Sequence, residues 1–231
     1  MENEKRCITG IMGFDKLCQG GLINESVNLI LGNAGSGKTT FLLQFLYNGA
    51  TKFNENGLFI TFEQDPEDLY KGGLKQGMDF KTLEKQEKCF ILKIDPESSI
   101  KQIEKLLLSK ITKNDIQRIC FDPINIFSMG FPKEINLRKQ LYNFFSLLKQ
   151  LKVCVLISGE SDSESTDGNN KFEKEIIFCR YLSDSIIELF SSGIAGKGDR
   201  ALRILKMRMT SHVRGPVGMQ ITSSGIKLEK F

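Results

Sequence analysis

The sequence predicts an α/β protein with a mainly parallel, twisted sheet, helices on both faces and antiparallel strands near its C-terminal end. Three observations support this fold class. Short apolar segments alternate with amphipathic segments over most of the chain. A glycine-rich loop joins the first predicted strand of this alternation to the first predicted helix. The last part of the chain contains strand-like segments separated by turn signals, without intervening helical patterns.

Six segments have the β-branched, aromatic and mostly continuous apolar character of strands that are covered on both faces. They are residues 27–31, 58–62, 90–94, 118–121, 153–157 and 186–190. Between them, apolar residues at helical spacing form stripes within 41–46, 100–111 and 137–148. Because successive strands joined by crossover helices run parallel, this alternation predicts a parallel sheet with helices on both sides.

The segment 159–174 reads GESDSESTDGNNKFEK, which nearly lacks apolar side chains and predicts an exposed, mobile loop. After this segment the pattern is rich in strands and shows no obvious helix. Strand-like stretches at 201–209, 218–222 and 226–228 are separated by turn signals such as Arg214-Gly215-Pro216. We expect these strands to extend the sheet in antiparallel fashion. Since no internal repeat or proline-rich linker interrupts the chain, we predict one domain, residues 1–231.

The composition disfavours several classes of protein. Lys and Arg number 32 against 28 Asp and Glu, and an excess of +4 does not by itself argue for nucleic-acid binding. No apolar run is long enough for a transmembrane helix, and no signal-peptide pattern follows the polar start. The six cysteines form no Cys-x-x-Cys pair, which disfavours a structural metal site or disulfide framework. We therefore expect a cytoplasmic protein without membrane association.

The strongest motif fits Gly-x-x-x-x-Gly-Lys-Ser/Thr in full and reads Gly32-Asn33-Ala34-Gly35-Ser36-Gly37-Lys38-Thr39, followed by Thr40. A strand precedes the motif and an amphipathic helix follows it. Glycines let the backbone N–H groups approach phosphate oxygens, and the helix N-terminus favours negative charge. The motif predicts binding of a nucleoside triphosphate, with ATP and Mg²⁺ as the expected ligands. The base preference, ATP against GTP, is not encoded in this loop.

The residue types predict a role for individual residues of this site. Lys38 should contact the β- and γ-phosphates, and the Thr39 hydroxyl should ligate Mg²⁺. Asp122 ends an apolar strand and should bind the same Mg²⁺ through water, although an aspartate before Pro123 could also be a turn or capping residue. A glycine-rich turn that merely joins strand to helix is the alternative for the loop itself.

Hydrolysis also requires a group that orients or deprotonates water. Glu63 follows an apolar strand, and side chains at the carboxyl ends of parallel strands face the ligand crevice. Glu63 is therefore the candidate base. The alternative is a surface residue at the start of a loop, because nearby Asp65, Glu67 and Asp68 look like capping residues at a helix start. Ser158, at the end of another strand, could hydrogen-bond the γ-phosphate region or simply be a polar loop residue.

The chain resembles the RecA-like P-loop ATPases and, within them, the KaiC group. Four blocks carry the resemblance, in the family's order. They are Ile8-Thr9-Gly10-Ile11-Met12-Gly13-Phe14-Asp15-Lys16-Leu17 with Gly20-Gly21-Leu22, the phosphate loop continuing to Gln44-Phe45-Leu46-Tyr47-Asn48-Gly49, Thr61-Phe62-Glu63 with Asp65-Pro66-Glu67-Asp68, and Leu205-Lys206-Met207-Arg208 with Thr210-Ser211-His212.

The resemblance implies a homo-hexameric ring with ATP bound between subunits, and it supports Glu63 as the base. It also implies that Lys206 and Arg208 reach the nucleotide of the neighbouring subunit, as an arginine finger does. Met207, Thr210 and His212 would lie near that nucleotide. Without the resemblance, Lys206 and Arg208 would be interpreted as part of a solvated edge-strand face.

Departures from the family pattern limit what the resemblance implies. The family often has two consecutive acids where this chain has Glu63-Gln64, which predicts slow hydrolysis. Asp122 is followed by Pro123 where a serine is usual. The adjacent Ser-Thr phosphorylation pair of two-domain members appears as Arg180-Tyr181, so timed phosphorylation is not implied and autokinase activity stays open.

Three functions remain in competition. The first is a KaiC-like ATPase whose slow hydrolysis switches the shape of a ring and signals to an unidentified protein partner. The second is a RecA-like accessory ATPase of DNA recombination, supported only by Lys133 and Arg138 within 129–138. The third is a nucleotide-binding scaffold with negligible turnover, suggested by Gln64.

Overall fold

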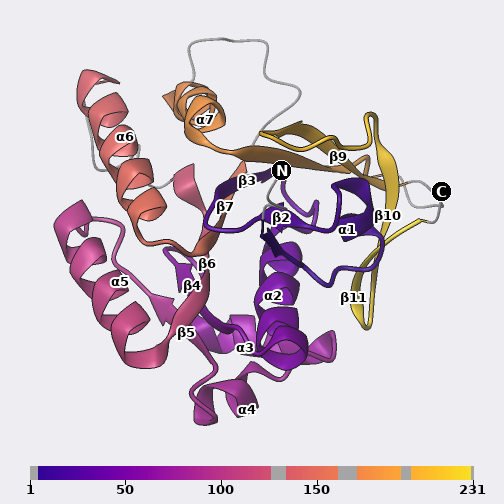
Figure 1. The fold of residues 1–231 in the computed structure, drawn as a ribbon, viewed down its shortest axis with the longest axis horizontal. Coiled ribbons are helices and arrows are strands. Elements are labelled where there is room, and N and C mark those ends of the chain that lie inside the picture. Colours follow the sequence, from indigo (N-terminus) through magenta and orange to yellow (C-terminus); the bar gives the residue numbers. More distant parts are fainter. Residues whose placement is uncertain (1–4, 126–133, 161–170, 194–198, 230–231) are drawn as a thin grey trace.

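The computed structural model describes residues 5–125, 134–160, 171–193 and 199–229 of the 231-residue chain. They build a nine-stranded sheet in the order β11-β10-β9-β8-β3-β7-β6-β4-β5, and a small two-stranded sheet of β1 (Arg6–Cys7) and β2 (Leu22–Ile23). Figure 1 shows helices on both sides of the large sheet and the antiparallel strands at one end of it. The predicted fold class is confirmed.

The six predicted strands of the parallel part all exist and differ from the predictions only at their ends. They are β3 (Val27–Gly32), β4 (Asn56–Thr61), β5 (Cys89–Lys93), β6 (Ile116–Asp122), β7 (Cys154–Glu160) and β8 (Ser185–Ser191). Each neighbouring pair in the order β8-β3-β7-β6-β4-β5 is parallel. Their carboxyl ends therefore meet at one edge of the sheet, where ligands of open α/β sheets bind.

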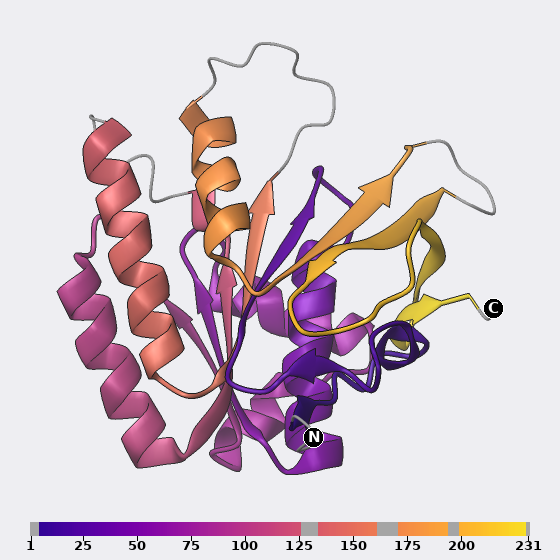
Figure 2. The same ribbon diagram turned by 45° about the horizontal axis from the view of Figure 1, so that its top comes forward.

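The C-terminal strands extend the sheet as predicted. β9 (Arg200–Met207) pairs antiparallel with β8, β10 (Val217–Thr222) with β9, and β11 (Gly225–Leu228) with β10. Figure 2 shows these strands curling over the side of the molecule that also carries α1 (Phe14–Leu17). The curl brings β10 next to the carboxyl end of the parallel strands.

Helices cover the two faces of the sheet differently (Figures 1 and 2). One face carries α2 (Lys38–Asn48), its π-helical extension η1 (Gly49–Phe53), α3 (Pro66–Lys75) and α4 (Phe80–Lys85). The other face carries α5 (Ile100–Asn114), α6 (Glu134–Gln150) and α7 (Lys171–Leu182). The helices predicted within 41–46, 100–111 and 137–148 are confirmed, whereas no periodicity predicted α4 or α7.

Capping residues explain where two of these helices begin. The Asp65 side chain accepts a hydrogen bond from the Glu67 backbone N–H at 3.0 Å, and Pro66 occupies the first helical position of α3. This confirms Asp65 as a capping residue. Ser99 and Gln102 form a reciprocal capping box at the start of α5.

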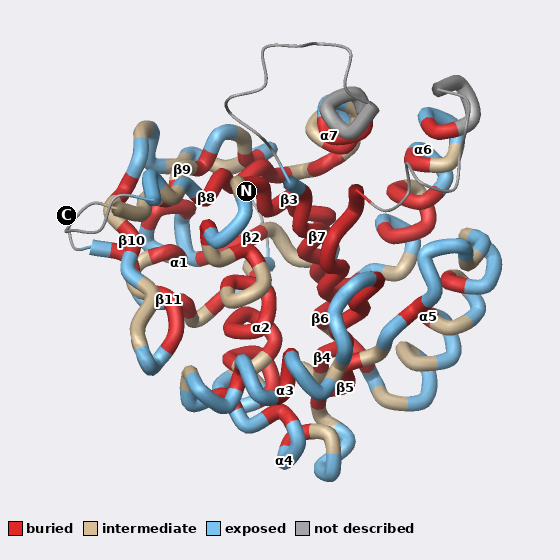
Figure 3. The backbone as a smooth tube through the Cα atoms, turned by 180° about the vertical axis from the view of Figure 1, so that it is seen from behind, coloured by how far each residue is buried: buried red, intermediate tan, exposed pale blue. Residues whose placement is uncertain are grey.

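Each face of the sheet has its own apolar core. Alternating strand residues divide between them: Ile30 and Leu156 pack under α2, whereas Leu29 and Ile157 pack under α6 and α7. The central strands and α2 are almost wholly buried in Figure 3. As expected, Cys89, Cys120 and Cys154 lie in these cores as small buried side chains.

Arg118 is a buried cation that connects distant parts of the chain. Its side chain on β6 has no exposed surface, and its Nε lies 2.5 Å from Glu55 Oε2. Its two terminal nitrogens donate to the carbonyl oxygens of Phe45 on α2 and Ile8 near the N-terminal end, each at 2.8 Å. Since buried charges require such partners, Arg118 fixes the N-terminal segment against α2.

The prediction of a loop over 159–174 was wrong at both ends. β7 continues to Glu160, and α7 begins at Lys171. The remaining part, 161–170, lies outside the described residues. Among the residues that the structure does describe, no helix has the length and apolar character needed to cross a membrane.

Candidate functional site

The loop between β3 and α2 has the conformation that its glycines permit. Gly37 adopts a left-handed conformation with φ of 102° as the residue before α2, which strongly favours glycine. A Cβ atom on Gly32 would collide with the carbonyl oxygen of Leu189 on neighbouring β8. No side chain caps the N-terminus of α2, and its first turn contains no acid. The free N–H groups and positive end of this helix therefore favour an anion.

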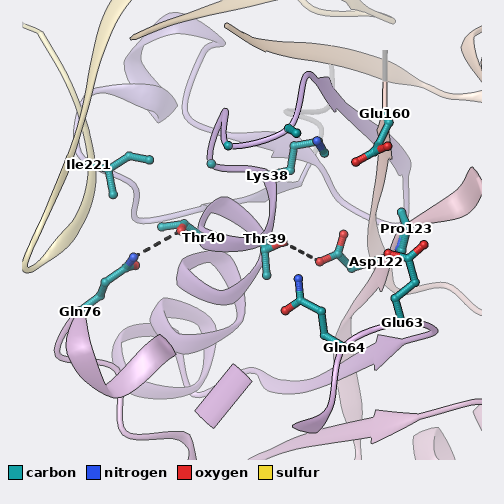
Figure 4. Close-up of a pocket in the computed structure, with 13 residues that line it drawn as sticks. Lys38, Thr39, Thr40, Glu63, Gln64, Gln76, Asp122, Pro123, Glu160 and Ile221 are labelled. Atoms are coloured by element: carbon teal, nitrogen blue, oxygen red, sulfur yellow. Dashed lines mark hydrogen bonds between the residues drawn. The ribbon is translucent and has the colours of Figure 1, made fainter. Parts of the chain in front are cut away.

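A pocket lies directly over this helix start (Figure 4). Its lining comes from the loop, from strand ends and from two segments far away in sequence. The lining residues are Ala34, Gly35, Gly37, Lys38, Thr39, Thr40, Glu63, Gln64, Gln76, Asp122, Pro123, Glu160 and Ile221. All predicted residues of the loop thus lie in or directly beside one site.

Lys38 is folded over its own loop. The side-chain amine donates hydrogen bonds to the carbonyl oxygens of Gly32 at 2.8 Å and Asn33 at 3.0 Å, and the residue is only 8% exposed. Figure 4 shows the amine on the pocket side of the loop. A flexible ammonium in this position is suited to an anionic ligand as a mobile point charge.

Thr39 and Asp122 meet at the centre of the site. The Thr39 hydroxyl donates to one carboxylate oxygen of Asp122 at 2.7 Å, across 83 positions of sequence. The other carboxylate oxygen accepts a hydrogen bond from the Ser158 hydroxyl. Ser158 has no exposed surface and lies within β7, so it is not a polar loop residue. Its hydroxyl fixes the carboxylate of Asp122.

Glu63 lies just beyond β4, on the side of Asp122 away from the phosphate loop (Figure 4). The Lys93 amine binds its backbone carbonyl at 3.0 Å and so fixes the start of this turn. Desolvation raises the pKa of the Glu63 carboxyl, and the charges of Glu160 and Asp122 raise it further. A raised pKa brings a carboxylate closer to the basicity that proton abstraction requires.

This raised pKa predicts an acid limit for any hydrolysis that uses Glu63 as a base. Only the ionised carboxylate accepts a proton, so kcat/KM should fall as the pH drops through the pKa of Glu63 in the free protein. The midpoint should lie above the ordinary glutamate pKa of about 4.3. A pH profile of phosphate release at limiting ATP tests this, with the fold monitored by circular dichroism at each pH. A midpoint at or below the ordinary glutamate pKa would contradict the prediction.

Three residues of the pocket were missed from the sequence. Glu160 was assigned to the polar loop, although it ends an apolar strand as Asp122 does, and that shared pattern was the available signal. The Gln76 amide donates to the Thr40 hydroxyl at 3.3 Å, from the turn after α3. Ile221 enters from β10. No local pattern distinguishes Gln76 or Ile221 from other surface residues.

Lys206 and Arg208 do not lie in the pocket of their own chain. Strand pairing places Met207 opposite Ser185 at the start of β8, whereas the phosphate loop begins opposite the far end of that strand. The Lys206 amine donates to the carbonyl oxygens of Arg180 at 3.0 Å and Ser183 at 2.6 Å. Desolvation, followed by the charge of Arg208, lowers the pKa of Lys206.

The other residues of this segment have contacts of their own. Arg208 pairs with Asp184 at 3.2 Å and donates to the Tyr181 carbonyl at 3.2 Å, and its side chain is about half exposed. Thr210 accepts a hydrogen bond from Arg6 at 2.7 Å. Met207 is only 7% exposed, and His212 is half-buried beside the Val213 carbonyl. Arg208 is therefore the cation of this group that projects from the surface.

Comparison with known proteins identifies the family. The family model described as "ATPase: KaiC" matches residues 7–230, nearly the whole chain. The chain belongs to the KaiC family of ATPases. This family agrees with the pocket, in which a complete phosphate loop lies beside acids at the strand ends.

Individual KaiC proteins are similar over the same length. The circadian clock oscillator protein KaiC of Thermosynechococcus vestitus is 30% identical over 233 residues, covering 97% of this chain and 44% of that protein. The protein of the same name from Synechococcus elongatus is 30% identical over 229 residues, covering 95% and 43%. The chain thus spans less than half the length of the curated relatives it matches.

A solved structure extends the likeness to three dimensions. The crystal structure of a KaiC-like protein from Pyrococcus horikoshii OT3 superimposes with a TM-score of 0.85 at 26% identity. The match covers 99% of this chain and 100% of that chain. The RecA-like fold expected from the resemblance is therefore confirmed over nearly all of the chain.

Proposed function

We propose that this chain binds ATP with Mg²⁺, hydrolyses it slowly and acts as an oligomeric, nucleotide-dependent switch in signalling or regulation. One observation carries the proposal: the Thr39 hydroxyl and the Asp122 carboxylate meet at 2.7 Å beside the uncapped N-terminus of α2. A hydroxyl and a carboxylate at the end of a phosphate loop are the protein groups that hold Mg²⁺ in P-loop ATPases. Membership of the KaiC family supports the same ligand.

Each residue of the pocket has its own role in hydrolysis. The phosphates occupy the N-terminus of α2, where loop N–H groups bind them. Lys38 exchanges its carbonyl partners for phosphate oxygens. Thr39 and Asp122 are the residues that would hold Mg²⁺. An ion held there would supply positive charge opposite the negative charge of the phosphates. Glu63 accepts a proton from the attacking water.

We propose that the pocket is completed by a second copy of the chain in a homo-hexamer. Lys206 and Arg208 are too far from their own phosphate loop to serve it, and the exposed Arg208 side chain is free to turn outward once it leaves Asp184. In this arrangement Arg208 and Lys206 act on the neighbour's nucleotide. Thr210, His212 and the backbone of Met207 lie nearby. The resemblance to the KaiC group supports this ring.

The proposal treats residues 1–231 as a single domain that works in the cytoplasm with an unidentified protein partner. Turnover is slow because Gln64 takes the place of a second consecutive acid. No observation favours a role in DNA recombination. Of the two cations that suggested it, Lys133 lies outside the described residues, and the Arg138 guanidinium lies 4.0 Å above the Phe178 ring.

Removal of Mg²⁺ tests whether Thr39 and Asp122 form a site for the ion that hydrolysis requires. Phosphate release from ATP should stop when EDTA removes Mg²⁺ and return when Mg²⁺ is restored. Asp122→Asn should lower kcat on the order of a hundredfold, since it weakens an electrostatic group at the reacting phosphate. The matched control is Asp95→Asn, on an exposed turn outside the pocket. Release that persists in EDTA, or an Asp122→Asn variant as active as this control, would contradict the proposal.

A further inference from the structure

Three carboxylates converge on the pocket from three neighbouring strands. Glu63 follows β4, Asp122 ends β6 and Glu160 ends β7, and these strands are adjacent in the order β7-β6-β4. Parallel pairing places Glu160 directly beside Gly32, the first residue of the phosphate loop. Glu160 therefore stands next to the bound phosphates in the site proposed above.

The backbone at Glu160 is held in place. Its N–H donates to the Asn125 side-chain oxygen at 2.8 Å, and Asn125 is only 9% exposed. This bond joins the carboxyl ends of β6 and β7. Figure 4 shows the Glu160 carboxylate directed toward the Lys38 side of the pocket, so that Glu160 and Glu63 lie on either side of Asp122.

The three carboxylates differ in their hydrogen-bond partners. Asp122 is bound by the hydroxyls of Thr39 and Ser158. The carboxylates of Glu63 and Glu160 have no hydrogen bond or ion pair within the described part of the chain. Both remain available to a ligand or to water. Besides desolvation, the charge of Glu160 raises the pKa of Glu63, as expected of two carboxylates that line the same pocket.

Position 64, next to the candidate base, holds a glutamine whose neutral amide cannot act as a carboxylate. We propose that Glu160, from a different strand, supplies the second carboxylate of the hydrolytic site and orients the attacking water together with Glu63. This inference rests on the proposed ATPase function. It gives Glu160 a role that the phosphate-loop pattern does not include.

The step balances with ATP and water alone. The water oxygen forms a bond to the γ-phosphorus while the bond from that phosphorus to the β,γ-bridging oxygen breaks. The electron pair of the broken bond leaves with ADP. Glu63 takes one water proton and later returns it to solvent, and Glu160 accepts a hydrogen bond from the other. Two acceptors fix the orientation of the water and so reduce the entropic part of the barrier.

Glu160→Gln is the decisive variant. It should lower kcat for phosphate release on the order of a hundredfold, the lower end of the range for groups that assist proton transfer. Binding of a fluorescent ATP analogue with Mg²⁺ should stay close to wild type, because the carboxylate is not a phosphate ligand. Glu160→Asp, which keeps the charge, should retain part of the activity. Glu97→Gln is the matched control, since Glu97 is exposed and outside the pocket.

A double variant tests whether the two acids act on one water. The loss in Glu63→Gln/Glu160→Gln should be smaller than the product of the single losses, as expected of groups that work as a unit. A kcat for Glu160→Gln equal to that of Glu97→Gln would overturn the inference. So would tighter ATP binding with unchanged kcat, because Glu160 would then only repel the triphosphate. Failure of the proposed function looks different: wild type itself would release no phosphate above a Lys38→Ala control, which would overturn both.

Discussion

Replacing Lys38 with alanine is expected to abolish measurable phosphate release and to weaken nucleotide binding. The amine is held by two loop carbonyls on the pocket side of the loop, so it needs only a short movement to reach phosphate oxygens. Its charge acts where negative charge accumulates during transfer, and the loss of one such group costs on the order of a hundredfold to a thousandfold in kcat. Steady-state phosphate release and titration with a fluorescent ATP analogue measure the two effects.

Two controls separate this result from a general loss of structure. Lys101→Ala removes an exposed lysine of α5, on the other face of the sheet from α2, and should leave both measurements unchanged. The thermal unfolding of Lys38→Ala without nucleotide should remain cooperative, because the amine donates to carbonyls of the loop and takes no part in the apolar cores. Hydrolysis at the wild-type rate in Lys38→Ala would mean that the phosphates are bound elsewhere.

The second large effect is expected from Arg208→Ala. An arginine that reaches a neighbour's nucleotide contributes roughly 10³–10⁵ to kcat in enzymes that use one. Nucleotide binding should change little, since the phosphate loop is untouched. In the free chain Arg208 gives up only an exposed pair with Asp184 and one carbonyl contact, and exposed pairs contribute about 1 kcal/mol or less. Arg214→Ala, at an exposed arginine nearby, is the control.

Mixing two inactive variants tests the direction of this contribution. A ring that contains both Lys38→Ala and Arg208→Ala subunits has some sites with an intact loop from one subunit and an intact arginine from the next. Such mixtures should recover part of the wild-type phosphate release. If Arg208 acted within its own chain, each subunit would carry one defect and the mixture would stay inactive.

Most of the fold followed from apolar patterning because the parallel strands are buried on both faces. Their continuous apolar runs are distinctive, and the observed strands differ from the predicted ones only in their first and last residues. Helix α7 was missed because its first residues belong to a polar stretch. Among the α7 side chains whose burial the structure describes, Ile176 and Cys179 are the buried apolar ones, too few to mark a helical period. Short α4 offers just two buried residues, Phe80 and Leu83, too few for a helical period to be recognised.

Some residues of the site could be located from neighbouring sequence, and others only from the tertiary structure. The phosphate loop is contiguous, so sequence alone located it. Asp122 and Glu63 followed from acids placed at strand ends, a rule that also applied to Glu160 but was masked by the polarity of the next residues. Ser158 and Glu160 are two positions apart and project to the same side of β7. The first is buried against Asp122 and the second reaches the pocket, a difference decided by tertiary packing.

If two subunits share each ATP site, hydrolysis depends on assembly of the oligomer. Phosphate release per chain is followed over a series of protein concentrations, with the mass of the particles determined in parallel, for wild type and Arg208→Ala. A shared site predicts activity that rises as oligomers form and that is lost in Arg208→Ala even where the variant assembles. Activity that is independent of both assembly and Arg208 would contradict the shared site and leave a nucleotide-binding domain that works alone.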